Sequence, residues 1–246
     1  MRVVVSIGGS VLAPELDPDR VAAYADALER LADGEYEVGV VVGGGGVARE
    51  YITTARELGA NEVDLDELGI GTTRLNARLL IAALGETAVP SPTTEYDEAV
   101  AAIRRGETPV MGGITPGQTT DAVAAVLAEV VDADLLVFAT SADGVYDVDP
   151  NRHDDATRFE TLTPVELVDV VVPMSRDAGS SAPVDLLAAK LIGRGGVRSI
   201  VLDGTDPDAV IDAIRDGNHT GTEIVPDGGD APPQWDREGR SGGTAE

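Results

Sequence analysis

Short runs of β-branched and aliphatic residues alternate along the chain with longer segments of helical periodicity. Each short run is continuously apolar, which is typical of strands that are covered on both faces of a parallel sheet. We therefore predict strands at residues 3–7, 38–42, 109–111, 134–139, 199–202 and 222–225.

The segments between these runs carry helix boundary signals. Asp17 is suited to N-cap a helix with Pro18 at its first position, and Gly34 follows the last apolar position of that helix. Further helices are predicted at residues 47–58, 95–105, 121–131 and 183–194. This alternation predicts an α/β fold with a mostly parallel sheet and helices on both of its faces.

The last twenty or so residues, 227–246, are rich in glycine, proline and charge and show no periodicity. We predict a single domain over residues 1–226, followed by a disordered acidic tail. Trp235 lies in that tail, where an exposed side chain is favoured over one that docks on a partner.

Composition narrows the functional class. The formal net charge is −26, the acids are spread along the chain, and only Lys190 among the 18 basic residues is a lysine. Such self-repulsion is tolerable where salt screens charges beyond about 3 Å, as at 1 M, so the composition is haloarchaeal-like and predicts a halophilic protein. An acidic tail or a basic partner is the alternative explanation of the negative charge. The lack of cysteine excludes thiol chemistry, the charge disfavours nucleic acid as a partner, and the absence of a signal peptide or membrane span favours the cytoplasm.

Two glycine-rich segments directly follow predicted strands. Gly8-Gly9-Ser10 ends the first strand, and Gly43 to Gly46 ends the second, with Arg49 on the first turn of the next helix. Glycines allow backbone N–H groups to approach a phosphate, and a helix N-terminus with an arginine is an anion site. A tight turn is the alternative for the first segment. The P-loop and Rossmann glycine patterns are both absent.

Two more polar segments follow strands, at residues 112–121 and 140–150, and both offer hydroxyls and carboxylates. Asp121 in the first is suited either to orient a cationic group or simply to N-cap a helix. Ligands of open α/β sheets bind beyond the carboxyl ends of strands, where all four segments are predicted to lie. Lys190 is suited to a moving phosphoryl group, so we predict phosphoryl transfer between ATP and a second small molecule.

In combination, these segments resemble the amino acid kinase family, and within it the archaeal type of UMP kinase. The similarity covers residues 1–226. Its motifs are Ile7-Gly8-Gly9-Ser10-Val11-Leu12, Val42-Gly43-Gly44-Gly45, Ala48-Arg49, Met111-Gly112-Gly113, Pro116-Gly117, Thr119-Thr120-Asp121-Ala122-Val123-Ala124-Ala125, Asp143-Gly144-Val145-Tyr146, Asp149-Pro150 and Leu187-Ala188-Ala189-Lys190.

The resemblance implies a three-layer α/β/α domain that assembles as a homohexamer and converts ATP and UMP to ADP and UDP in pyrimidine biosynthesis. The acceptor is expected to bind the N-terminal part and ATP the part from about residue 122. Mg²⁺ is expected to be held mainly by the ATP phosphates, with no dedicated metal ligands. The residues implied are Lys190, Asp121 and Arg49 for catalysis, Gly9, Ser10, Gly45, Arg49, Thr140, Tyr146 and Asp149 for ATP, and Gly44, Asp66, Ile114, Thr115, Pro116, Gly117, Gln118, Thr119 and Thr120 for UMP.

One position departs from the family pattern. Many members carry a lysine just before the first glycines, where this chain has Ser6. The charge stabilisation must then come from Lys190, Arg49, Mg²⁺ and backbone donors. Two alternatives stay open. One is a kinase of the same fold with another acceptor (isopentenyl phosphate, carbamate, aspartate or acetylglutamate), and the other is a non-catalytic nucleotide-dependent binding or storage protein.

Overall fold

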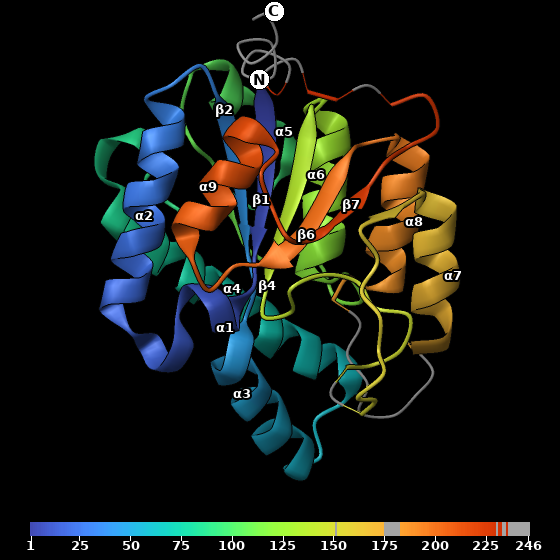
Figure 1. Ribbon diagram of the computed structural model, residues 1–246. Helices are drawn as coiled ribbons and strands as arrows, with labels where there is room; N and C mark the ends of the chain where they lie inside the picture. Colours follow the sequence, from blue (N-terminus) through green and yellow to red (C-terminus); the bar gives the residue numbers. More distant parts are fainter. Residues whose placement is uncertain (151, 175–182, 230, 233–234, 236–246) are drawn as a thin grey trace, which may run out of the picture.

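A seven-stranded sheet forms the centre of the protein (Figure 1). The computed structural model describes residues 1–150, 152–174, 183–229, 231–232 and 235. The strand order is β3-β2-β1-β4-β6-β7-β5, and all neighbours are parallel except β6 and β7. The strands are β1 Arg2–Ile7, β2 Glu37–Val42, β3 Val110–Met111, β4 Leu135–Thr140, β5 Thr161–Leu162, β6 Ser199–Asp203 and β7 Thr222–Ile224. The six predicted strands are confirmed, and β5 was not predicted.

Helices cover both faces of the sheet, so the predicted three-layer α/β/α architecture is confirmed (Figure 1). The helices α2 (Pro18–Ala32), α4 (Glu62–Leu84) and α9 (Pro207–Asp216) pack on one face. On the other face lie α5 (Tyr96–Arg104), α6 (Thr120–Val130), α7 (Pro164–Met174) and α8 (Leu186–Gly195). The helices α1 (Gly9–Leu12) and α3 (Gly45–Glu57) lie at the carboxyl end of the strands. No described helix is both long and apolar enough to span a bilayer.

Cap residues explain where several helices start. Asp17 caps α2 as predicted, with its carboxylate 3.0 Å from the Asp19 N–H that donates to it. The helix predicted from residue 183 starts instead at Leu186, because Asp185 caps it by accepting from the N–H groups of Leu187 and Ala188. The sequence analysis did not identify α4, α7 and α9.

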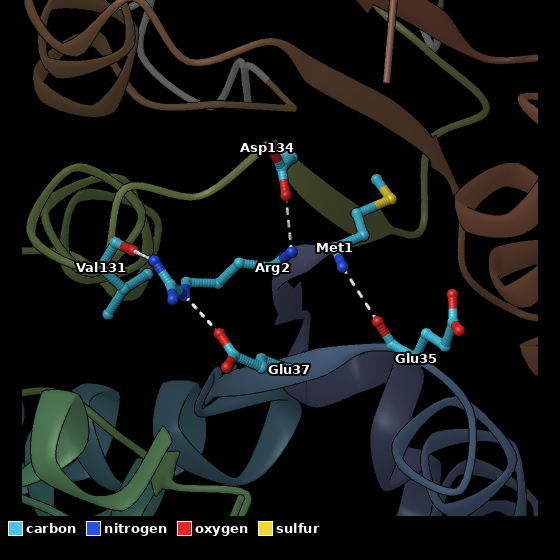
Figure 2. Close-up of polar contacts among 6 residues, drawn as sticks. All are labelled: Met1, Arg2, Glu35, Glu37, Val131 and Asp134. Carbon is cyan, nitrogen blue, oxygen red and sulfur yellow. Dashed lines mark hydrogen bonds and ion pairs between the residues drawn. The ribbon is translucent and has the colours of Figure 1, made fainter. Parts of the chain in front are cut away.

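Hydrogen bonds join the amino ends of the central strands, at the end of the sheet opposite the glycine loops (Figure 2). The Met1 amino group donates to the Glu35 carbonyl at 2.9 Å. The Arg2 backbone N–H donates to Asp134 at 2.7 Å, and its side chain pairs with Glu37 at 2.7 Å. These contacts join β1 to the residues that begin β2 and precede β4, and so fix the register of the three central strands.

Trp235 packs against the domain, so the prediction of an exposed side chain is wrong. Its indole Nε1 donates to the Ile214 carbonyl at 3.1 Å, and the ring packs against the hydrophobic core near Gly217, at the end of α9. The Arg198 guanidinium lies 6.0 Å from the ring centroid. Most of the segment predicted to be disordered, 227–246, lies outside the described residues.

We expect Trp235→Ala to lower the free energy of unfolding by about 2 kcal/mol, because it removes a half-buried ring and leaves the Ile214 carbonyl without its donor. Urea unfolding at constant molar KCl measures the change. Trp235→Phe keeps most of the packing and should lose about half as much. An unchanged unfolding midpoint for the alanine variant would show that the docked ring contributes no stability.

Candidate functional site

A cavity of about 570 Å³ opens at the carboxyl ends of β1, β2 and β4. Its walls come from the three segments that follow these strands, together with the first turn of α6. This volume falls in the range of small-molecule sites, and the position is the one where open α/β sheets bind ligands.

The two glycine loops interlock at the base of this cavity. A Cβ added to Gly9 would lie 2.5 Å from the carbonyl carbon of Gly44, and closer still to Gly43 O and Gly45 N. Gly45 has a positive φ of 66°, which disfavours any side chain there. Glycines are needed here because the two backbones are in contact. No side chain covers their backbone groups, which line the cavity.

The helix α3 starts at Gly45 on the cavity wall, with no side chain capping its N-terminus. Its free N–H groups and positive dipole end favour an anion. Arg49 lines the same cavity with an exposed side chain. Because α3 begins two residues before the predicted start, Arg49 lies beyond the first turn rather than on it, and it still faces the site.

Asn76 on α4 holds the second glycine loop in place. It is 3 % exposed, and its Nδ2 donates to Gly43 O at 2.8 Å and Gly44 O at 3.3 Å. Sequence reasoning missed this residue, because no helix was predicted there and a single asparagine carries no motif.

Asp121 lies in the second position of α6 and lines the cavity. Burial and, next, the nearby Asp185 carboxylate raise the pKa of Asp121 to about 7, while the hydrogen bond from the Ser6 hydroxyl at 3.1 Å acts in the opposite direction. Thr119, and not Asp121, caps α6 by accepting from the Ala122 N–H. The alternative role of Asp121 as an N-cap is therefore wrong.

The segment after β4 forms the opposite wall of the cavity. Thr140 accepts from the Ala142 N–H at 3.0 Å, which turns the chain at the strand end. The Tyr146 hydroxyl donates to Asp143 at 2.8 Å, and both side chains line the cavity with Asp149.

Within the predicted acceptor loop, 114–120, Thr120 lines this cavity and residues 114–119 do not. The loop is held beside α4, where Asp66 Oδ2 accepts from the Gly117 N–H at 2.8 Å. Gln118 donates to the Tyr96 hydroxyl at 3.2 Å. Asp66 is exposed and one of its oxygens is already used by the loop, so its contact with an acceptor stays a prediction.

The structure thus brings the predicted ATP-binding residues together in this cavity, whereas one predicted catalytic residue, Lys190, lies outside it. The residues of the predicted sets that line the cavity are Gly9, Ser10, Gly44, Gly45, Arg49, Thr120, Asp121, Thr140, Tyr146 and Asp149.

Lys190 lies elsewhere, so the expectation that it stabilises the transferring phosphate is not supported by its position. Its exposed side chain lines a second cavity of about 670 Å³, with Thr163, Val168 and Pro226. The reason is geometric: Asp185, at the start of α8, hydrogen-bonds Thr119 near the site, and Lys190 follows more than one turn farther along the helix.

Comparison with known proteins decides the family. A family model described as the amino acid kinase family matches residues 1–203. The chain belongs to the amino acid kinase family. The resemblance found in its glycine motifs is therefore confirmed.

This amino acid kinase is similar to proteins named uridylate kinase. It is 74 % identical to that of Halorubrum lacusprofundi over 96 % of this chain and 98 % of the relative. It is 64 % identical to that of Haloquadratum walsbyi over 96 % and 98 % of the two chains. The crystal structure of uridylate kinase from Archaeoglobus fulgidus superimposes with a TM-score of 0.81 at 41 % identity, covering 92 % of this chain and 100 % of that chain. The haloarchaeal relatives support the prediction of a halophilic protein.

Proposed function

We propose that this amino acid kinase transfers the γ-phosphoryl group of ATP to UMP, giving ADP and UDP for pyrimidine nucleotide synthesis in the cytoplasm. The observation that carries the proposal is the single cavity in which two interlocked glycine loops, the N-terminus of α3 and Arg49 converge. The similarity to uridylate kinases over nearly the whole chain identifies the acceptor class.

In this proposal ATP occupies the cavity, with its phosphates on the Gly9 and Gly45 loops and its nucleoside toward Thr140, Tyr146 and Asp149. UMP lies on the side of Gly44, Thr120 and the loop 114–119, with Asp66 close to the ribose. The transferring group then passes between the glycine loops and the start of α6, where Asp121 and Arg49 face it.

Mg²⁺ fits the chemistry of this donor set. The carboxylates Asp121, Asp143 and Asp149 outnumber Arg49, the one basic side chain among the described lining residues. Mg²⁺ binds through one or two carboxylates together with substrate phosphates, and no described cluster of three or more acidic or histidine side chains forms an all-protein metal site. When bound with ATP, Mg²⁺ would neutralise charge that develops on the phosphoryl oxygens.

Phosphoryl transfer depends mainly on positioning and charge neutralisation, and it needs no covalent intermediate. The backbone N–H groups of the glycine loops and α3 hold the phosphates. Asp121 lines the cavity and accepts a hydrogen bond from Ser6, so it would orient the cations or the metal there and need not act as a base.

We expect Arg49→Ala to lower kcat about tenfold, a modest loss because an exposed cation is partly screened in molar salt. Lys190→Ala is the matched comparison and should stay within about twofold of the wild type, since the loss of a distant exposed charge changes little. Steady-state kinetics in molar KCl measures both. A large loss for Lys190→Ala with none for Arg49→Ala would reverse the assignment.

The proposed reaction is tested by its products. Incubation with Mg²⁺-ATP and UMP should form UDP and ADP in equal amounts, as resolved by anion-exchange chromatography. ADP formed without UDP would mean that the protein hydrolyses ATP and would contradict the proposal.

We also propose self-association, with the homohexamer as the assembly. Exposed apolar side chains on α3 and α4 support an interface on that side. Sedimentation equilibrium in molar KCl should give the mass of the hexamer, and a monomer would contradict it. The residues concerned are Tyr51 on α3, Leu58 at its C-cap, and Val63, Leu68, Leu75 and Leu79 on α4.

A further inference from the structure

The helix α4 grips the start of the proposed acceptor loop through adjacent side chains. Thr73 Oγ1 accepts from the Gly113 N–H at 2.7 Å and donates to the Ile70 carbonyl at 2.7 Å. Thr73 is 6 % exposed, so this bond is shielded from water. The loop backbone is therefore fixed to the helix at Gly113.

Arg74 extends this contact by one residue along the loop. Its Nε donates to the Gly113 carbonyl at 3.1 Å, and its Nη2 donates to the Ile114 carbonyl at 3.3 Å. The planar guanidinium fork can hold two successive carbonyls at once, which a lysine ammonium on one flexible stem does less well. Arg74 is half-buried, so its two bonds compete less with water than those of an exposed arginine.

The loop has no room to move closer to the helix or to carry side chains at its start. A Cβ on Gly112 would lie 2.5 Å from Thr73 Oγ1 and 3.0 Å from Arg74 N. A Cβ on Gly113 would lie 2.9 Å from Ile70 Cγ1. Close packing at Gly112 and Gly113 and the Arg74 hydrogen bonds to Gly113 and Ile114 thus act on adjoining residues of the loop.

The same stretch of α4 also holds the donor side of the site. Asn76, two residues after Arg74, donates to the carbonyls of Gly43 and Gly44 in the second glycine loop. One rigid helix therefore sets the distance between the loop that would hold the acceptor and the loop that would hold the ATP phosphates. In-line transfer is sensitive to that distance.

We propose that Arg74 is a positioning residue that preorganises the acceptor loop for the nucleoside monophosphate. The inference rests on the proposed function, since it assigns the loop 114–119 to UMP. Arg74 acts on the loop carbonyls and not on the reacting atoms. Without it, the loop must be ordered when the acceptor binds, and that cost appears in acceptor affinity.

We expect Arg74→Ala to raise KM for UMP about tenfold or more, while KM for ATP stays within about twofold. Arg74→Lys should fall between the alanine variant and the wild type. Arg78→Ala is the matched control, because Arg78 is an exposed arginine one turn farther along α4 and makes no hydrogen bond to the loop in the described part of the chain. Equal increases in both KM values, or the same effect from Arg78→Ala, would overturn the inference.

Hydrogen–deuterium exchange tests, without an activity assay, whether the Arg74 hydrogen bonds order the loop. Arg74→Ala should speed exchange of the Gly113 and Gly117 amides, which donate to Thr73 and Asp66, and should leave the β1 and β4 amides unchanged. Unchanged amide exchange in the loop of Arg74→Ala would contradict the proposed positioning role. Wild-type protein that forms no UDP would instead contradict the proposed function, so the two failures are distinguishable.

Discussion

Gly9→Ala is expected to reduce turnover at least about a hundredfold, the scale of loss that a misplacement of reacting groups by about 1 Å can cause. The added methyl group would lie 2.5 Å from the Gly44 carbonyl carbon and even closer to two further backbone atoms of the second loop. Backbone atoms cannot rotate away as a flexible side chain can, so the two loops must separate. That separation moves the proposed phosphate-binding groups apart, and it should also lower the free energy of unfolding by about 1–3 kcal/mol.

Gly46→Ala is the control for this prediction. A Cβ on Gly46 would meet no atom within 4 Å, and Gly46 is not among the glycines with positive φ. Alanine also favours the helix in which Gly46 lies, so this variant should be as stable as the wild type or slightly more stable. Steady-state kinetics and thermal unfolding compare the two variants. Full activity of Gly9→Ala would show that the loops are not interlocked.

Asp121→Asn is expected to lower the activity strongly while it raises the stability. Turnover should fall about a hundredfold, in line with the loss of groups that orient a metal or cation. The free energy of unfolding should rise near neutral pH, because asparagine keeps an oxygen for the Ser6 hydroxyl and removes a buried charge.

The pH dependence gives the sign of this effect. Since burial and Asp185 raise the pKa of Asp121 to about 7, the folded protein keeps a proton that the unfolded chain releases at lower pH. Wild-type stability from this group is full below the ordinary aspartate pKa and is lost as the pH rises through about 7. Relative to the wild type, the free energy of unfolding of Asp121→Asn should therefore rise between about pH 4 and pH 7, by at most about 4 kcal/mol.

Unfolding in urea at constant molar KCl across this pH range measures the difference between variant and wild type. Asp185→Asn provides the control, because asparagine still caps α8 while the repulsion on Asp121 is removed. Asp185→Asn should lower the pKa of Asp121, so the pH range over which this stability is lost should move to lower pH. A variant-minus-wild-type difference that does not change with pH would contradict the raised pKa.

The sequence was sufficient for six of the seven strands and for the loops that line the cavity. Continuous apolar runs located the central strands, and glycines directly after β1 and β2 marked the loops that interlock. The positions that line the cavity follow strand ends, and parallel strands bring those ends to one edge of the sheet. Local pattern and topology therefore agreed, although ATP contacts themselves remain predictions.

The acceptor side was harder to predict from the sequence, because α4 contains Gly69 and Gly71 and lacks a clear helical pattern. Without that helix in the prediction, the contacts made by Arg74 and Asn76 could not be expected. Lys190 shows the converse error. Its rarity suggested a catalytic role, but rarity does not define where a side chain lies in the fold.

A comparison of acceptors in molar KCl with Mg²⁺-ATP tests the central claim most directly. ADP production should be measured separately with UMP, CMP, dUMP, isopentenyl phosphate, carbamate, aspartate and acetylglutamate. The account predicts that kcat/KM is highest for UMP, by at least about tenfold over each of the others. Preferential turnover of another compound would contradict the assignment of UMP, and ATP binding without turnover of any acceptor would contradict catalysis.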